Sequence, residues 1–231
     1  MLTCKPKKIA VVGAGIAGAA CARTLTSAGH SVHVFDKSRG PGGRLATRRF
    51  EWVDPQGQAW TTRLDHGAVG ITARSQAFQA FVDQALHAGW LAEWAPTLSA
   101  DSLPLEDGGR LYVPAPDMPA LCRRLLDGTA ATWVFAVDGL HRGPLGWQVQ
   151  AGGERHSTQF DTVVLALPPA QAAPLISHHR SDWGSACVCR RDATVLDAGR
   201  HRGCSRGCPA TCAGLGRGPA ANRSAGLGAA Q

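Results

Sequence analysis

The feature that most constrains the fold is a set of three glycines that follows a short apolar run near the N-terminus. Residues 9–12 form a continuous run rich in branched side chains, which is typical of a central parallel strand covered on both faces. Gly13, Gly15 and Gly18 then follow at the spacing G-x-G-x-x-G. The first glycine permits a tight turn, the second lets the backbone approach a pyrophosphate, and the third lets a helix pack closely on the strand.

A helix and a second strand complete this unit. The sequence predicts a helix over residues 16–28 that ends at Gly29, and the N-terminus of this helix would present unpaired amides to phosphate groups. Residues 31–35 alternate as a strand does, and Asp36 follows 18 residues after Gly18, where a ribose-binding carboxylate belongs. The alternative is a glycine-rich turn without a ligand, but the strand, the helix and the acid together favour a dinucleotide site.

A second glycine pair separates FAD from NAD as the predicted cofactor. Gly42 and Gly43 are followed by Arg44, and a plain nicotinamide-dependent dehydrogenase has no use for such a segment. It resembles the G-G-R segment of FAD-dependent amine-oxidase-like flavoproteins, whose backbone and arginine help to hold the pyrophosphate and the neighbouring flavin. The alternative is a surface loop rich in Gly and Pro that carries a solvated arginine.

The rest of the first 183 residues also reads as mixed α/β. We predict a hairpin over residues 48–68 that turns at 54–57, a helix over 119–126, and a two-strand meander within 132–150. A buried strand over 162–167 would be stopped by Pro168 and Pro169.

Together these segments resemble the bacterial renalase-like flavoproteins of the amine oxidase superfamily. The likeness extends from Lys8 to about Trp183 and rests on the order of five motifs. They are the glycine motif with Asp36-Lys37, the Gly42-Gly43-Arg44 segment, Asp65-His66-Gly67-Ala68, Tyr112-Val113 with Met118 and Leu121, and Val163-Val164-Leu165-Ala166-Leu167-Pro168 with Gln171.

This resemblance implies a two-domain α/β flavoprotein. Its Rossmann-like FAD-binding domain, of the amine oxidase/glutathione reductase type, would consist of residues 1–72 and 119–183. Residues 73–118 would form a partial α+β substrate domain over the flavin, and residues 184–231 a separate low-complexity tail.

The resemblance also implies which residues bind FAD. The glycine loop would take the pyrophosphate, the acid and its neighbour the adenosine ribose, and the later segments the flavin end, with a strand at Ala136-Val137 near the adenine. The residues implied are Gly13, Ala14, Gly15, Ile16, Ala17, Gly18, Asp36, Lys37, Gly43, Arg44, Gly67, Ala68, Val137 and Ala166. One departure concerns Val69 and Gly70, which stand where the family usually has Gln and an aromatic residue, so a polar group near the flavin would be missing.

The chemistry implied by the resemblance is hydride transfer to flavin N5, with O2 as the electron acceptor. The substrate would be a small molecule, either a reduced nicotinamide dinucleotide isomer or an amine. Because FAD carries the difficult step, no catalytic triad is required. The resemblance places one titratable side chain near the flavin, His66, with an acid–base role and an orienting or core role both open. We expect the other histidines at the surface.

The composition changes abruptly after Trp183. The last 48 residues contain no Ile, Phe, Trp, Tyr, Met, Lys or Glu, and five of the eight cysteines lie between Cys187 and Cys212. A segment with so few large apolar groups cannot bury enough surface to offset its chain entropy, which predicts disorder. A metal site is the alternative, but the cysteine spacing matches neither zinc knuckles nor known iron–sulfur motifs.

A frameshift explains this composition in another way, since GC-rich codons read out of frame give Arg, Ala, Gly, Cys, Pro and Ser. We hypothesise a single-base shift near Trp183-Gly184, which resequencing of the gene would test. The family's later segments would then be lost, and we expect weak FAD retention and poor solubility. The alternatives are an inactive dinucleotide-binding remnant and a Rossmann domain with a cysteine-rich metal-binding tail.

The charge distribution argues against a nucleic-acid partner. The formal net charge is +7, but seven arginines against Asp192 and Asp197 lie after Trp183, and the preceding residues carry 17 Lys and Arg against 15 Asp and Glu. A nearly neutral body offers no basic binding face. Without a membrane span or an export signal we expect a cytoplasmic protein, in which Cys4, Cys21 and Cys122 are free thiols. The oligomeric state is left open.

Overall fold

The computed structural model describes residues 5–97 and 110–179. The cysteine-rich tail, and with it the disorder, metal-site and frameshift predictions, lies outside the described residues. The chain divides into two units, Met1–Leu167 and Pro168–Gln231, which are treated separately.

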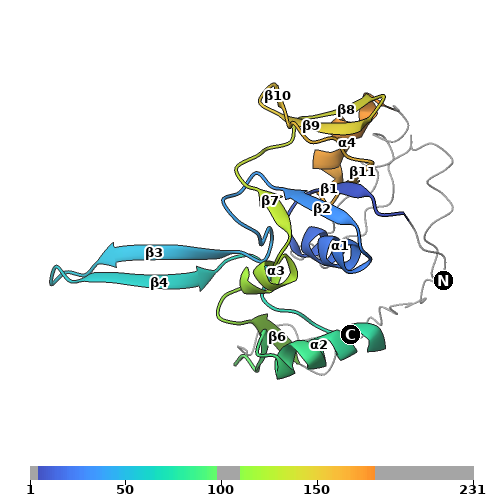
Figure 1. Ribbon diagram of the computed structural model, residues 1–231. Helices are drawn as coiled ribbons and strands as arrows, with labels where there is room; N and C mark the ends of the chain where they lie inside the picture. Colours follow the sequence, from blue (N-terminus) through green and yellow to red (C-terminus); the bar gives the residue numbers. More distant parts are fainter. Residues whose placement is uncertain (1–4, 98–109, 180–231) are drawn as a thin grey trace, which may run out of the picture. The chain divides into compact units, whose positions relative to one another are not determined.

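A four-stranded parallel sheet is the centre of the first unit (Figure 1). Its order is β11-β1-β2-β7, and each neighbouring pair runs parallel. This arrangement confirms the predicted mixed α/β class and the strands predicted at 9–12 and 31–35. The strands are β1 (Lys8–Val12), β2 (Ser31–Phe35), β7 (Ala130–Thr132) and β11 (Thr162–Leu165).

Small residues allow the first helix to lie close to this sheet. Helix α1 (Ile16–Ser27) buries Gly18, Ala19 and Ala22, so its backbone packs without intervening bulk. The helix stops before Gly29, whose φ of 86° suits glycine. The predicted helix and its end are therefore confirmed.

The outer strand β11 differs from the prediction. We expected a buried strand over 162–167, but β11 ends at Leu165 and its four residues are only half-buried. The reason is its place at an edge of the sheet, with β1 on one side and no further paired strand among the described residues. Ala166 still donates its N–H to the carbonyl of Val12 at 2.8 Å.

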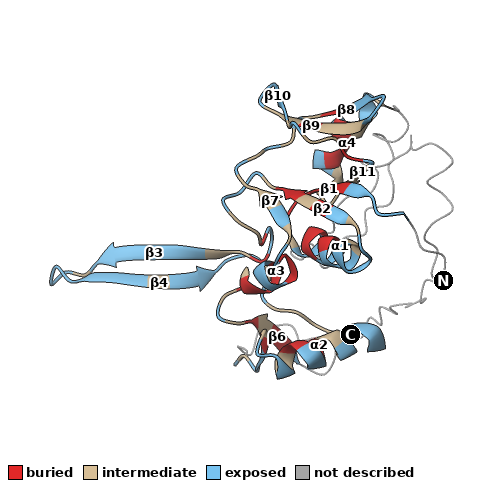
Figure 2. Ribbon diagram, viewed as in Figure 1, coloured by how far each residue is buried: buried red, intermediate tan, exposed pale blue. Residues whose placement is uncertain are grey.

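The predicted hairpin is confirmed as β3 (Thr47–Val53) and β4 (Ala59–Asp65), paired antiparallel along their full length. Its turn is organised by Asp54, whose carboxylate accepts hydrogen bonds from Trp60 Nε1 at 2.8 Å and from the Gln58 N–H at 2.9 Å. These bonds, that of Trp60 first, lower the pKa of Asp54. Nearly all of both strands is exposed (Figure 2).

A helix and a second antiparallel pair follow, which the sequence reading did not predict as separate elements. Helix α2 (Gln76–His87) begins where the Ser75 hydroxyl accepts a hydrogen bond from the Phe78 N–H at 3.2 Å. Its buried residues, Val82 and Ala85, belong to the same apolar core as β1. Strand β5 (Leu91–Trp94) pairs with β6 (Leu111–Pro114).

Helix α3 (Ala120–Leu125) confirms the helix predicted over 119–126. Cys122 in this helix is fully buried, and burial raises the pKa of its thiol to about 11. Cys122 and Cys21 are free cysteines, as expected, while Cys4 lies outside the described residues. A thiol so deeply buried is inert at neutral pH.

The two-strand meander predicted within 132–150 is confirmed by β8 (Gly139–Gly143) and β9 (Gly146–Ala151), which pair antiparallel. Strand β10 (Glu154–Arg155) extends that sheet, while β7 joins the parallel sheet. The expected strand at Ala136-Val137 is wrong. The backbone there turns toward the β2 end, since the N–H groups of Val134 and Phe135 donate to Ser38 and Asp36 carbonyls.

The surface prediction for the other histidines is also wrong for His33 and His156. Both are half-buried, and both rings contact the buried ring of Phe35, at centroid distances of 4.5 and 4.9 Å. Burial, and then the charge of His156, lowers the pKa of His33. The alternation of residues along β2 predicts that the His33 side chain lies on one face of a sheet. It does not predict that Phe35, His156 and Phe160 contact the ring there.

In the second unit the described element is helix α4 (Pro169–Ser177), which starts directly after Pro168. Proline suits the first turn of a helix, where its missing N–H costs nothing. Across the described residues of both units, no helix combines the length and apolar character needed to cross a membrane.

Candidate cofactor-binding site

The first glycine loop fits so tightly that two of its positions exclude any side chain. A Cβ at Gly13 would lie 2.6 Å from the carbonyl oxygen of Ala166, and the φ of Gly13 is 105°. A Cβ at Gly18 would lie 1.8 Å from the carbonyl oxygen of Gly13. These contacts hold the start of α1 against the ends of β1 and β11, as the motif predicts.

Gly15 has a different reason to be glycine. It precedes α1 with extended backbone at φ −70°, and a Cβ there would meet nothing closer than the Gly43 Cα at 3.9 Å. The fold therefore does not need glycine at this position, but a ligand approaching the loop would. The first turn of α1 has no side-chain cap and no acidic residue, so its N-terminal amides suit an anion.

Asp36 lies at the end of β2 beside this loop. Its carboxylate accepts hydrogen bonds from the Ala14 N–H at 2.6 Å and from the Ser38 N–H at 2.8 Å. The two bonds fix the carboxylate against the loop and leave lone pairs that can accept a ribose hydroxyl. Lys37, by contrast, is exposed.

The second glycine segment is joined to the first. Gly42 forms a bridge with Gly15 and donates its N–H to the Ala14 carbonyl at 3.0 Å. A Cβ at Gly43 would lie 3.0 Å from the Gly15 Cα, and Gly43 has a φ of 58°. The structure thus brings together two segments that a surface-loop reading of Gly42-Gly43-Arg44 would have left apart.

A third segment continues from there. Ala68 donates its N–H to the Arg44 carbonyl at 2.9 Å, and His66 donates its own to the Ala46 carbonyl at 3.1 Å. A Cβ at Gly67 would lie 1.9 Å from the Arg44 carbonyl oxygen. Hydrogen bonds therefore join three segments of backbone into one continuous track: the loop of residues 13–18, residues 42–44 and Gly67-Ala68.

The remaining predicted residues are Ala166 and Val137. Ala166 packs beside the first loop, since a Cβ added to Gly18 would lie 3.2 Å from the Cβ of Ala166. Val137 is half-buried and lies two residues after Phe135, whose N–H donates to the Asp36 carbonyl at 2.9 Å. Asp36 thus lies at one end of this backbone, and Gly67 and Ala68 at the other.

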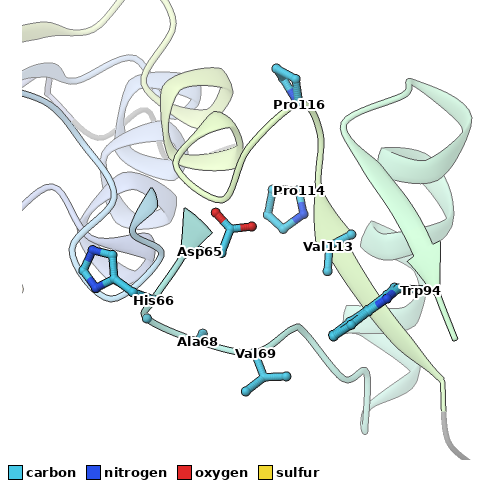
Figure 3. Close-up of a pocket in the computed structure, with 9 residues that line it drawn as sticks. Asp65, His66, Ala68, Val69, Trp94, Val113, Pro114 and Pro116 are labelled. Carbon is cyan, nitrogen blue, oxygen red and sulfur yellow. The ribbon is translucent and has the colours of Figure 1, made fainter. Parts of the chain in front are cut away.

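A cavity of about 530 Å³ opens at the Gly67-Ala68 end (Figure 3). The Asp65 carboxylate, the Trp94 indole and the Pro114 ring face it, whereas the His66 ring points away from Trp94. Its full lining is Asp65, His66, Gly67, Ala68, Val69, Trp94, Val113, Pro114 and Pro116. The wall at Val69 is apolar, where the family resemblance leads one to expect glutamine.

Sequence reading missed several of these residues as parts of the site. Asp65 belongs to the Asp65-His66-Gly67-Ala68 motif, and its position directly before His66 could have indicated that it lies at the flavin end. Trp94 carried no such signal, because strand β5 was not predicted and its pairing with Leu111 of β6 joins positions far apart in the sequence. Among residues 5–97 and 110–179, no group of three His, Cys, Asp or Glu side chains could hold a metal ion.

Comparisons with known proteins agree with the α/β fold. A family model described as an NAD(P)-binding Rossmann-like domain matches residues 11–85. A tRNA 5-methylaminomethyl-2-thiouridine biosynthesis bifunctional protein from Magnetococcus marinus is 30% identical, covering 73% of this chain. Mouse L-amino-acid oxidase is 43% identical over 24% of it. The chain spans only 30% and 9% of the lengths of these two relatives.

Two solved structures share the fold at low sequence identity. Cyclohexylamine oxidase from Brevibacterium oxydans matches with a TM-score of 0.57 at 12% identity, over 80% of this chain and 63% of that one. A fatty acid isomerase from P. acnes matches with a TM-score of 0.56 at 13% identity, over 79% and 64%. Residues 11–85 therefore match a Rossmann-like domain, within an α/β fold that this chain shares with cyclohexylamine oxidase.

Proposed function

We propose that this chain is an FAD-dependent oxidoreductase of renalase-like type. The observation that carries the proposal is the locking of the second glycine segment onto the first, through the Gly15–Gly42 bridge and the Gly42–Ala14 hydrogen bond. A dinucleotide that ends at the first loop needs no such extension, whereas FAD is long enough to use it. The names of the relatives, an L-amino-acid oxidase and a cyclohexylamine oxidase among them, point in the same direction.

Each part of the track would hold one part of FAD. Asp36 would accept a hydrogen bond from the adenosine ribose, and the amides at the start of α1 would bind the pyrophosphate. Arg44 and the Gly67-Ala68 backbone would lie along the flavin end. We assign FAD binding to residues 1–72 and 119–183, and a partial substrate domain to residues 73–118.

When bound, FAD supplies the hydride acceptor, and the protein binds, orients and desolvates the reactants. The cavity at Ala68 would receive a reduced nicotinamide dinucleotide isomer or an amine. Its apolar walls at Trp94 and Pro114 would exclude water from a flat ring. The Asp65 carboxylate faces the same space and could pair with a cationic amine. His66 would orient its segment through its backbone.

The experiment tests FAD binding and turnover separately. Because we expect weak retention, the full-length protein is titrated with added FAD, and flavin reduction is then followed anaerobically with a reduced dinucleotide or an amine. Saturable FAD binding followed by bleaching of the flavin absorbance is expected. Binding without bleaching would favour the inactive remnant, and no binding would refute the proposal.

A substitution at Gly15 sharpens this test. We expect Gly15→Ala to leave the fold intact, because the backbone is extended and the added Cβ meets no atom closer than 3.9 Å, while it narrows the approach to the loop. We expect FAD affinity to fall about tenfold, which corresponds to about 1.4 kcal/mol. Gly143→Ala in β8 is the matched control, since a Cβ there also meets no atom closer than 3.9 Å. An equal effect of both variants would contradict the assignment.

A further inference from the structure

A second cavity, of about 480 Å³, lies at the base of the β3–β4 hairpin. It shares no lining residue with the cavity of the candidate cofactor site. Three of its lining side chains are arginines and one is a carboxylate, so the lining carries two more positive than negative charges. The lining residues are Thr47, Arg49, Arg63, Asp117, Pro119 and Arg123.

The carboxylate of Asp117 positions two of the three guanidinium groups. Its side chain is only 12% exposed, and its two oxygens accept from Arg123 Nη2 at 2.5 Å and Arg63 Nη1 at 3.3 Å. Each guanidinium has five N–H donors, and each gives one of them to Asp117. Because each arginine is held by its bond to Asp117, its remaining N–H donors stay close to the cavity.

The third arginine stands in an unfavourable place. The antiparallel register puts Arg49 directly opposite Arg63, and like charges at opposed positions destabilise a strand pair. Arg49 reaches Glu51 at 3.7 Å, but both side chains are about two-thirds exposed, so this ion pair contributes little. An anion between Arg49 and Arg63 would convert the repulsion into two attractions.

We propose that this cavity binds a phosphate group. A phosphate monoester carries nearly two negative charges and three acceptor oxygens, which matches the surplus charge of the lining and the donors of three guanidiniums. Arginine is suited to phosphate because its planar fork binds two oxygens at once.

The position of the cavity indicates how such a group could be presented. The Thr47 hydroxyl donates to Asp65, which lines the first cavity, and accepts from the Met118 N–H at 3.2 Å. The two cavities therefore adjoin across the Thr47–Asp65 pair. The phosphate could be carried by a dinucleotide that also enters the first cavity, or it could be free phosphate.

Inorganic phosphate is the probe, titrated into the full-length protein at constant ionic strength and followed by ³¹P NMR line broadening. Saturable binding is expected, weakened about tenfold in Arg49→Gln and in Arg63→Gln by loss of a charge-assisted hydrogen bond. Arg48→Gln is the matched control. It lies next to Arg49 on β3, pairs in register with Leu64 and does not line the cavity, so its phosphate affinity should equal that of the wild type.

Three results would overturn the proposal. They are the absence of saturable binding, an equal loss in Arg48→Gln, and displacement of phosphate by saturating FAD, which would assign the anion to the cofactor site. Competition by a reduced nicotinamide dinucleotide, but not by the corresponding riboside, would identify a substrate phosphate. Phosphate binding without that competition would identify free phosphate. None of these readouts depends on flavin turnover, so failure here is distinguishable from failure of the proposed function.

Discussion

The parallel sheet and the β3–β4 hairpin both carry large apolar side chains, but only the sheet buries them. Phe35 in β2 is 0% exposed, whereas Trp52 and Trp60 in the hairpin are 43% and 50% exposed. The sheet collects strands from distant parts of the chain and is covered by α1, while the two hairpin strands, among residues 5–97 and 110–179, form a sheet of their own. An isolated two-stranded hairpin is marginally stable in water.

This difference shows that the buried parallel sheet, and not the hairpin, holds the candidate cofactor site in place. Its first loop and Asp36 are attached to the buried strands β1 and β2. The arginine-lined cavity instead rests partly on the exposed hairpin. Disturbing the sheet should therefore cost both stability and cofactor binding, whereas disturbing the hairpin should cost little stability.

The largest effect is expected for Gly18→Ala. The added Cβ would overlap the carbonyl oxygen of Gly13, and neither backbone can move without disturbing β1. We expect a loss of about 4–5 kcal/mol in the free energy of unfolding, near the upper limit for single substitutions, measured by urea denaturation.

Gly29→Ala is the control for that variant. Its φ of 86° is also unfavourable for alanine, but a Cβ there meets no atom within 4 Å. We expect a loss of about 1 kcal/mol from the backbone conformation alone. Equal losses in the two variants would show that close packing of the loop is not what requires Gly18.

An aromatic truncation in each region tests the comparison directly. Phe35→Ala should cost about 3–4 kcal/mol, because it leaves a cavity among His33, Phe135 and Phe160. Trp52→Ala should cost about 1 kcal/mol, mainly the stacked pair with Trp60. Similar losses in urea denaturation would mean that the hairpin is buried in solution.

Asp36→Asn should have a smaller effect on stability. An asparagine has one acceptor oxygen for two N–H groups, those of Ala14 and Ser38, so we expect a loss of about 2 kcal/mol. FAD affinity should fall as well. In the control, Asp161→Asn, the carboxylate accepts a hydrogen bond from the Lys8 N–H. FAD affinity should not change in this variant, and a parallel decrease there would argue against a ribose-binding role.

The smallest effect concerns pH. Since the pKa of His33 is lowered in the folded state, the unfolded chain binds the proton more readily. The stabilisation is present above the ordinary histidine pKa of 6.5 and is lost as the pH falls through that value and through the folded pKa. Urea denaturation should show this decline, and His33→Gln should flatten it. A slope unchanged in that variant would assign the titration elsewhere.

Local pattern predicted most of what is local in this molecule. The glycine loop, α1, the hairpin and α3 follow from spacing, alternation and turn residues over short stretches. The meander of β8 and β9 follows in the same way, whereas the half-exposure of β11 and the pairing of β7 with β2 depend on which distant strand lies alongside. The arginine-lined cavity could not be predicted from the sequence either. It depends on the strand register that places Arg49 opposite Arg63, and on Asp117, which comes from another segment of the chain.

The parallel pairing of β1 with β11 sets an order of events during synthesis. Lys8 and Asp161, which hydrogen-bond across β1 and the start of β11, are 153 positions apart in the chain. At cellular elongation rates the ribosome needs roughly 8–30 s to cover that distance. During this interval the glycine loop lacks the strand that closes it. A nascent chain of this protein must therefore protect β1, four of whose five residues are buried in the folded protein, well before its partner β11 exists.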